Sequence, residues 1–251
     1  MRRPRTRGFT LIELAVTVAI AAILGALAYD GMSRTRPRAN FNGVSAELQS
    51  LVHFARLHAL AEGVSVAVLV YPQYRGEGSQ GRIIVYQEST NPAWSLFNTA
   101  AALNFDNYDP AVLAAAAPPA PDLPATIVTT LDLSSGVNFG PDVGLAVAAL
   151  PFPYNGITTN VACSFCNAGG TGTRANRGAI VFNSRGQASF YSAAGNALAV
   201  QGGSLSICGT DLIAAGTTSM SCGGVLATGT FTTSTLVVTG VSGTGRTFHN
   251  G

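Results

Sequence analysis

A run of apolar residues close to the N-terminus constrains this chain more than any other feature. Phe9 to Tyr29 comprises 21 residues and contains a single charged side chain, Glu13. A helix of this length spans about 30 Å, the thickness of the hydrocarbon core of a bilayer. The run contains one glycine and no proline, which favours an unbroken helix. We therefore expect residues 9–29 to form a transmembrane helix.

Positive charge is concentrated in front of this run. All 14 basic residues are arginines, and four of them lie within residues 1–8, at positions 2, 3, 5 and 7. The positive-inside rule then keeps the short N-terminus in the cytoplasm and places the rest of the chain on the other side of the membrane. Without residues 1–8, 10 basic residues remain against 12 acidic ones, so the net charge changes from +2 to −2. A charged fraction of only 10% also argues against a disordered or nucleic-acid-wrapping protein.

Two interpretations compete for the apolar run. A cleavable secretory signal is one of them, because Ala26-Leu27-Ala28 offers a small-x-small cleavage site before Tyr29. However, the run is longer than the apolar part of a signal peptide, which is about 7–15 residues. In a signal peptide the carboxylate of Glu13 would only be unfavourable, because inserting an acid at the centre of a membrane helix costs about 2.5–3.5 kcal/mol. The acid in the apolar run therefore favours a functional role for Glu13, whose carboxylate needs an interaction partner.

The residues around Glu13 suggest that partner. Residues 8–13, Gly-Phe-Thr-Leu-Ile-Glu, resemble the processing site of type IV prepilins and type II secretion pseudopilins. The resemblance implies that a membrane peptidase cleaves between Gly8 and Phe9 and N-methylates Phe9. It also implies that Glu13 pairs with the N-terminal ammonium of a neighbouring subunit. Neither charge is tolerable alone in an apolar filament core, whereas the pair neutralises both.

The helix is expected to continue beyond the membrane over residues 30–63. Apolar residues recur at three- and four-residue spacing, which predicts an amphipathic helix with one buried stripe: Phe41, Val44, Leu48, Leu51, Val52 and Ala55. Pro37 is expected to kink the helix, because proline removes one backbone hydrogen bond. Gly63 is expected at the C′ position, where the helix ends.

After Gly63 the apolar period changes to two, which predicts a β-rich head over residues 64–251. The expected strands are residues 64–71 and 82–88 around a Gly-rich turn at 76–81, then 126–133, 179–183 and 187–192 around the turn 184–186, and finally 235–239 and 241–248. Antiparallel strands packed on one helix give an α+β fold. The Ala/Pro-rich stretch 100–125 predicts a surface excursion, and the Gly/Ser/Thr-rich stretch 201–234 is compatible with short strands or with a flexible loop.

Three parts of the head resemble the GspH/FimT-type minor pseudopilins: residues 40–63, the strand–turn–strand of residues 178–192, and the terminal strand with its Gly245-Arg246 dipeptide. The resemblance implies a minor pilin or pseudopilin, which is a structural subunit and not an enzyme, with no cofactor. Its implied partners are other pilins, the prepilin peptidase/methyltransferase, the inner-membrane assembly platform and membrane lipid. The implied location is the inner membrane, with a periplasmic head that joins a filament after assembly. Type IV pilus and type II secretion pseudopilus both remain open.

A DNA-capturing or adhesive minor pilin is the first alternative. Some family members bind DNA through a C-terminal Gly-Arg-x-Arg segment, but Phe248 stands here at the second basic position. Arg246 alone supplies one phosphate contact, and affinity for DNA accumulates over many contacts, so we expect no nucleic-acid partner. Arg174, Arg177 and Arg185 could form a small basic patch, although solvated surface arginines are the simpler interpretation.

The four cysteines are expected to form disulfides, because the head would face an oxidising compartment. Of the three possible connectivities we favour the local pairs Cys163–Cys166 and Cys208–Cys222, with long-range pairing still open. A second alternative is a secreted periplasmic protein with a cleaved signal and a redox Cys-x-x-Cys. No helical run follows this motif, however, and a thioredoxin-like site needs one.

Metal and catalytic motifs are not found in the sequence. The spacing of 14 between the second two cysteines does not suit a zinc knuckle. His53 and His58 are five apart on the helix and face different directions. The acids of the head are expected in or beside loops, where Asx turns account for them: Asp106, Asp109, Asp122 and Asp132. We therefore expect neither a metal site nor an active site.

Overall fold

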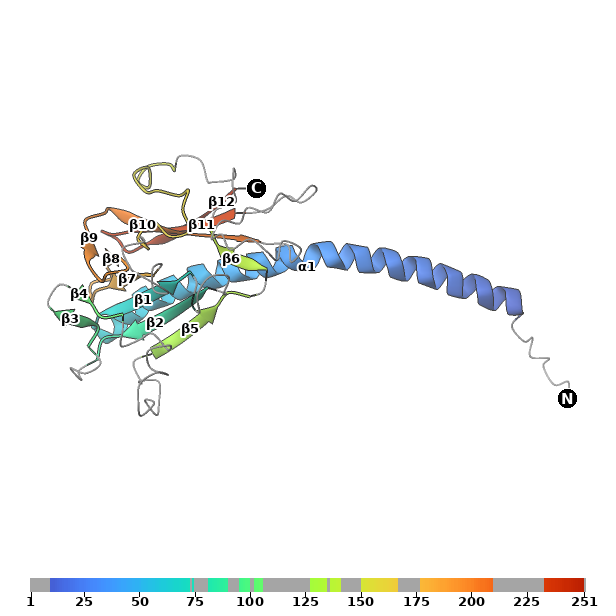
Figure 1. The fold of residues 1–251 in the computed structure, drawn as a ribbon, viewed down its shortest axis with the longest axis horizontal. Coiled ribbons are helices and arrows are strands. Elements are labelled where there is room, and N and C mark those ends of the chain that lie inside the picture. The colour runs from blue at the N-terminus through green and yellow to red at the C-terminus, as the bar shows by residue number, and fades with distance from the viewer. Residues whose placement is uncertain are drawn as a thin grey trace. The chain divides into compact units, whose positions relative to one another are not determined.

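The computed structural model describes residues 10–72, 74, 81–89, 95–99, 102–105, 127–134, 136–140, 150–166, 177–209 and 233–250. The chain divides into two compact units, Met1–Ala39 and Asn40–Gly251, which we describe separately (Figure 1). Helix α1 (Leu11–Glu62) contributes residues to both units. Gly8, Phe9 and Cys222 lie outside the described residues, as do Arg174 and three of the acids expected in loops, Asp106, Asp109 and Asp122.

The first unit contributes the apolar part of α1. The helix begins after Thr10, whose hydroxyl accepts a hydrogen bond from the Glu13 N–H at 3.4 Å, as an N-cap residue does. Leu11–Tyr29 is long and apolar enough to cross a membrane, and none of it is buried within the protein. The backbone remains helical through Pro37.

The second unit contains two antiparallel sheets. The six-stranded sheet has the order β5-β2-β1-β7-β8-β9, and the four-stranded sheet has the order β12-β11-β10-β6. The strands of the first are β1 (Val66–Tyr71), β2 (Arg82–Gln87), β5 (Ile127–Asp132), β7 (Gly178–Phe182), β8 (Ala188–Tyr191) and β9 (Ala197–Leu198). The strands of the second are β6 (Val137–Phe139), β10 (Gly202–Gly209), β11 (Thr233–Thr239) and β12 (Gly245–Asn250). A short hairpin pairs β3 (Phe97–Thr99) with β4 (Ala102–Leu103).

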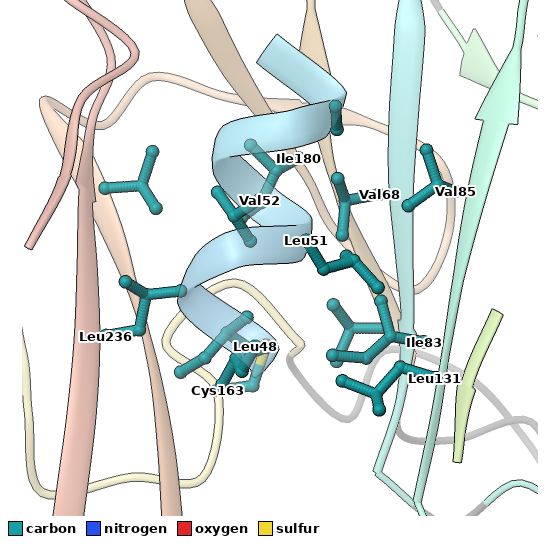
Figure 2. Packing of buried hydrophobic residues seen from close by; sticks show 14 of the residues in the cluster. Leu48, Leu51, Val52, Val68, Ile83, Val85, Leu131, Cys163, Ile180 and Leu236 are labelled. Atoms are coloured by element: carbon teal, nitrogen blue, oxygen red, sulfur yellow. The ribbon is translucent and has the colours of Figure 1, made fainter. Parts of the chain in front are cut away.

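The Asn40–Glu62 part of α1 fills the space between the two sheets. Leu48 and Val52 are 1% exposed, and they share one hydrophobic core with residues of both sheets. Figure 2 shows Val68 and Ile83 of the six-stranded sheet on one side of this helix and Leu236 of the four-stranded sheet on the other. The buried stripe predicted from the three- and four-residue spacing is therefore confirmed, and it contacts two layers of strands.

A second core lies on the other face of the six-stranded sheet. Leu96, Leu103 and Phe105, from the segment around β3 and β4, pack against residues such as Leu69 and Tyr86. The Glu88 carboxylate holds the start of this segment, because it accepts the Leu96 N–H at 2.9 Å. Strand β1 is consequently buried on both faces, which explains its continuous apolar sequence.

Several expected element boundaries agree with the structure. Helix α1 ends at Glu62, and Gly63 has a φ of 67° and donates its N–H to the Ala59 carbonyl at 3.1 Å, as the C′ assignment requires. The hairpins β1–β2, β7–β8 and β11–β12 also form as expected, with Gly186 at a φ of 72° in the second turn. The expected strand 241–248 is shorter at its start, because residues 240–244 form the turn that precedes β12.

Other expectations need correction or completion. The stretch 100–125 was expected to be a surface excursion, but its first part contains β4 and the buried Phe105; residues 106–125 lie outside the described residues. For the stretch 201–234, where short strands and a flexible loop were both open, the structure shows that residues 202–209 form strand β10. Asp132 lies beside a loop, as expected, at the end of β5, where it pairs with Arg82 of β2.

The position of Leu48 between the sheets gives a first prediction. Leu48→Ala removes buried methyl groups and leaves a cavity, so the free energy of unfolding should fall by about 2–5 kcal/mol. Leu57→Ala on the exposed side of the same helix is the control, with an expected change of about 0.5 kcal/mol. Urea unfolding of the full chain in detergent micelles, followed by circular dichroism, measures both. Equal losses for the two variants would contradict the buried position of Leu48.

Candidate assembly segment and head surface

Glu13 lies in the first turn of α1. Its backbone N–H donates to the Thr10 carbonyl at 3.1 Å. Its neighbours are strongly exposed apolar side chains, with Leu11 at 86% and Ile12 at 73%. Among the described residues no cation pairs with the Glu13 carboxylate.

The rest of the apolar segment contains no further charged side chain that would need a partner. Thr17 satisfies its hydroxyl within the helix, by donating to the Leu14 carbonyl at 2.9 Å. Large apolar side chains are exposed all round this part of α1, among them Val16, Val18, Ile20, Ile23, Leu24 and Leu27. A helix that is apolar on every side requires a non-aqueous environment on every side, which is lipid or other apolar helices.

The part of α1 in the head carries a further apolar surface. Phe54, Leu57 and Leu60 are 42%, 48% and 42% exposed, and we call these three residues the helix patch. Phe54 stacks on the ring of His58, with 5.6 Å between ring centroids. His58 in turn shares a hydrogen bond of 2.8 Å with Gln87 of β2. The patch is therefore held in place by the sheet although it faces outward.

Cys163 and Cys166 form a disulfide, the first of the two local pairs. The residues around it line the edge of β10. The backbone N–H of Ser164 donates to the Ser204 carbonyl at 3.0 Å, and the backbone N–H of Ser206 donates to the Ala162 carbonyl at 2.9 Å. Cys163 is buried in the core between the sheets, so the bridge fastens an edge segment to that core. Cys208 is also disulfide-bonded.

Arg246 is exposed on β12, which is the outer strand of the four-stranded sheet. Its guanidinium lies 5.4 Å from the centroid of the Phe248 ring, and Phe248 meets Tyr154 edge-on at 5.4 Å. Arg246 is therefore one accessible cation beside two aromatic rings.

The other described arginines of the head do not support a basic patch of 174, 177 and 185. Arg177 donates to the Ala193 carbonyl at 3.1 Å and lies 4.6 Å from the centroid of the Phe105 ring. Arg82 forms a two-pronged ion pair with Asp132, including a hydrogen bond of 2.7 Å, and this bond raises the pKa of Arg82. Arg185 is exposed in the β7–β8 turn. A search of the described residues finds no group of three or more side chains that could hold a metal ion.

The comparison with protein families identifies the segment that contains Glu13. Residues 3–29 match the family model of the prokaryotic N-terminal methylation motif. The chain carries a prepilin-type N-terminal methylation motif. Neither curated proteins nor solved structures give a match. The matched segment ends with Tyr29, as the apolar segment does.

The motif and the fold agree with each other. An N-terminal apolar helix followed by antiparallel strands is a pilin-like α+β arrangement, and the motif is that of membrane-anchored type IV pilin-like proteins. It indicates a structural subunit that assembles with other pilins and is processed by a prepilin peptidase. The sequence reasoning found this segment but missed the helix patch. Its signal was available, because Phe54, Leu57 and Leu60 recur at three-residue spacing outside the buried stripe.

The disulfide gives a second prediction. In the double variant Cys163→Ala, Cys166→Ala the segment beside β10 loses its covalent attachment, so the amides of Ser164 and Ser206 should exchange with deuterium faster than in the native chain. The amide of Ile180 in β7 serves as the internal control and should keep its protection. Hydrogen exchange of the full chain in detergent, read by mass spectrometry, decides this. Unchanged protection of both serine amides would show that the bridge does not hold the segment.

Proposed function

We propose that this chain is a minor pilin or pseudopilin of the GspH/FimT type, a subunit of a type IV pilus or a type II secretion pseudopilus. A prepilin peptidase removes residues 1–8 by cleaving after Gly8, and the new N-terminal residue, Phe9, is methylated. The mature subunit then leaves the lipid and enters a filament by packing its apolar helix against those of other pilins. The observation that carries this proposal is the methylation motif at residues 3–29, with Glu13 as the one acid of an otherwise apolar helix.

Electrostatics gives Glu13 its role in assembly. Cleavage creates an ammonium group at Phe9 in the same apolar surroundings as the Glu13 carboxylate. Each ion alone carries a desolvation penalty of several kcal/mol, and a pair in contact recovers much of it. A subunit in the membrane holds an uncompensated acid, whereas a subunit whose Glu13 meets the amine of its neighbour does not. Assembly is therefore favoured by charge neutralisation as well as by apolar contact.

The helix patch supports the same role for the head. Phe54, Leu57 and Leu60 are each more than 40% exposed on a helix whose opposite side already fills the core. They lie outside the stripe around Leu48 and Val52, which provides the buried surface of this helix. An exposed apolar patch marks an interaction site. We assign it to contact with a neighbouring subunit in the filament.

The charge distribution determines the orientation in the membrane that we propose for this chain. The four arginines of residues 1–8 remain in the cytoplasm before cleavage, and the head lies in the periplasm. The Cys163–Cys166 disulfide fits this location, because disulfides persist in oxidising compartments.

Capture of DNA by the head is the alternative function that one observation favours, the exposure of Arg246 beside two aromatic rings. Two facts oppose it: the mature chain has a net charge of −2, and the guanidinium of Arg177 is engaged with Ala193 and Phe105.

The role of Glu13 gives a third prediction. Glu13→Ala should still insert into the membrane and be cleaved, because the apolar helix and Gly8 are intact, but it should be largely lost from filaments because the amine of its neighbour has no counter-charge. Thr17→Val is the matched control, since it removes a polar hydroxyl of the segment without removing a charge, and it should assemble normally. Immunoblots of membrane and sheared-filament fractions measure both. Normal amounts of Glu13→Ala in filaments would refute the charge-pair argument.

The helix patch gives a fourth prediction. Leu57→Glu introduces a charge into the proposed contact, so the variant should be depleted from filaments while its unfolding free energy changes by about 0.5 kcal/mol or less. Ser189→Glu, on an exposed position of β8, adds the same charge outside the patch and should assemble as the native chain does. If both variants enter filaments equally well, the patch is not a subunit contact.

A further inference from the structure

The chain contains the dipeptide Asn-Gly three times, at residues 42–43, 155–156 and 250–251. In this dipeptide the backbone nitrogen of glycine can attack the side-chain carbonyl carbon of asparagine, because no Cβ obstructs the approach. The reaction requires two conditions: the glycine N–H must be free of a hydrogen bond, and the asparagine backbone must be able to rotate toward its own side chain. The structure describes both residues of the first two dipeptides, which differ in these conditions.

Asn155-Gly156 lies in an exposed turn between β6 and β7. Asn155 and Gly156 are the two central residues of a turn that one backbone hydrogen bond closes, from Ile157 to the Tyr154 carbonyl at 3.0 Å. A second bond, from Tyr154 to the Pro151 carbonyl at 2.8 Å, holds the residues before them. Within the described residues, neither the Gly156 N–H nor the Asn155 carboxamide has a hydrogen-bond partner. The space around Gly156 is also open, since the nearest atom to a Cβ placed there would be Gln201 Oε1 at 3.8 Å.

Asn42-Gly43 has the same chemistry and a similar exposure, but a different backbone. Both residues are exposed, and nothing lies within 4 Å of a Cβ placed on Gly43. They lie inside α1, where the Gly43 N–H takes part in the hydrogen-bond ladder of the helix and the Asn42 ψ angle is held at its helical value. Solvent access therefore does not separate the two dipeptides, whereas the hydrogen bonding of the glycine N–H does, because that of Gly43 belongs to the helix ladder.

We propose that Asn155 is a site of spontaneous deamidation through a succinimide formed with the Gly156 nitrogen, and that the helix protects Asn42 from the same reaction. The Gly156 nitrogen bonds to Asn155 Cγ, the Cγ–Nδ2 bond breaks, and ammonia leaves with the proton that the Gly156 nitrogen gives up. Water then opens the ring at either carbonyl and produces aspartate or isoaspartate. The net change is one water consumed and one ammonia released, with no oxidant or cofactor.

The modification falls on a turn that touches the four-stranded sheet. Tyr154, the residue before Asn155, packs its ring on Phe248 of β12, and β12 also carries Arg246. Deamidation introduces a negative charge directly beside Tyr154 and, in the isoaspartate product, lengthens the backbone of the turn. Because the reaction is spontaneous, the modified fraction of the protein rises with the time since synthesis.

The test uses the full chain in detergent micelles, incubated at mildly alkaline pH, digested with two proteases and analysed by mass spectrometry over time. The peptide with Asn155 should gain about one mass unit, with isoaspartate among its products, while the peptide with Asn42 stays unmodified. In denaturant the difference between the two peptides should disappear, because the helix that protects Asn42 is then lost. Equal modification of both peptides in the folded chain, or modification of Asn155 only after denaturation, would overturn the proposal.

Gly156→Ala provides the matched variant. The added Cβ meets only Gln201 Oε1 at 3.8 Å, an ordinary contact, so the fold should be unchanged in circular dichroism. The methyl group hinders approach of the nitrogen, so deamidation of Asn155 should slow severalfold. An unchanged rate in this variant would show that Asn155 loses its amide by direct hydrolysis and not through the succinimide.

Discussion

Burying an ionised carboxylate in an apolar environment costs several kcal/mol unless an opposite charge compensates it, and Glu13 brings this cost into the apolar helix. The segment Leu11–Tyr29 exposes apolar side chains on all sides, and among the described residues none offers a cation to Glu13. Delivery of a positive group to the acid would recover much of this cost. A prepilin methylation motif implies a means of delivery, since cleavage of such a motif releases an amine in the same apolar layer.

The two parts of helix α1 suit different environments, and the pattern of apolar residues changes between them. Before Tyr29 it is apolar all round, as lipid or a bundle of helices requires, and from Phe41 onward it narrows to one stripe that both sheets cover. The sheets bury this stripe from two directions, so the head folds around its own helix, and the helix patch remains exposed. Anchor, core and contact surface thus lie on one element, and the strands supply the shape of the head.

Local signals predicted the parts of the fold that local chemistry determines. Gly63 ends α1 because a C′ residue adopts a left-handed conformation that glycine tolerates. In the same way, Gly186 marks the turn of the β7–β8 hairpin. The division into two sheets depends on contacts between distant residues, so no short pattern revealed it. Strand β10 was hard to predict because its serines are polar and yet buried. Their hydroxyls donate to backbone carbonyls, that of Ser204 to Thr158 and that of Ser206 to Thr159. The assembly segment was predictable because its charge and its apolar length are local properties.

The N-terminus of the mature protein tests the central claim most directly. Intact-mass and fragment-ion analysis of the chain isolated from membranes and from sheared filaments identifies the first residue and its modification. The account predicts a chain that begins at N-methylated Phe9 and retains the apolar helix in both fractions. A mature chain that begins at Tyr29, without that helix, would contradict it.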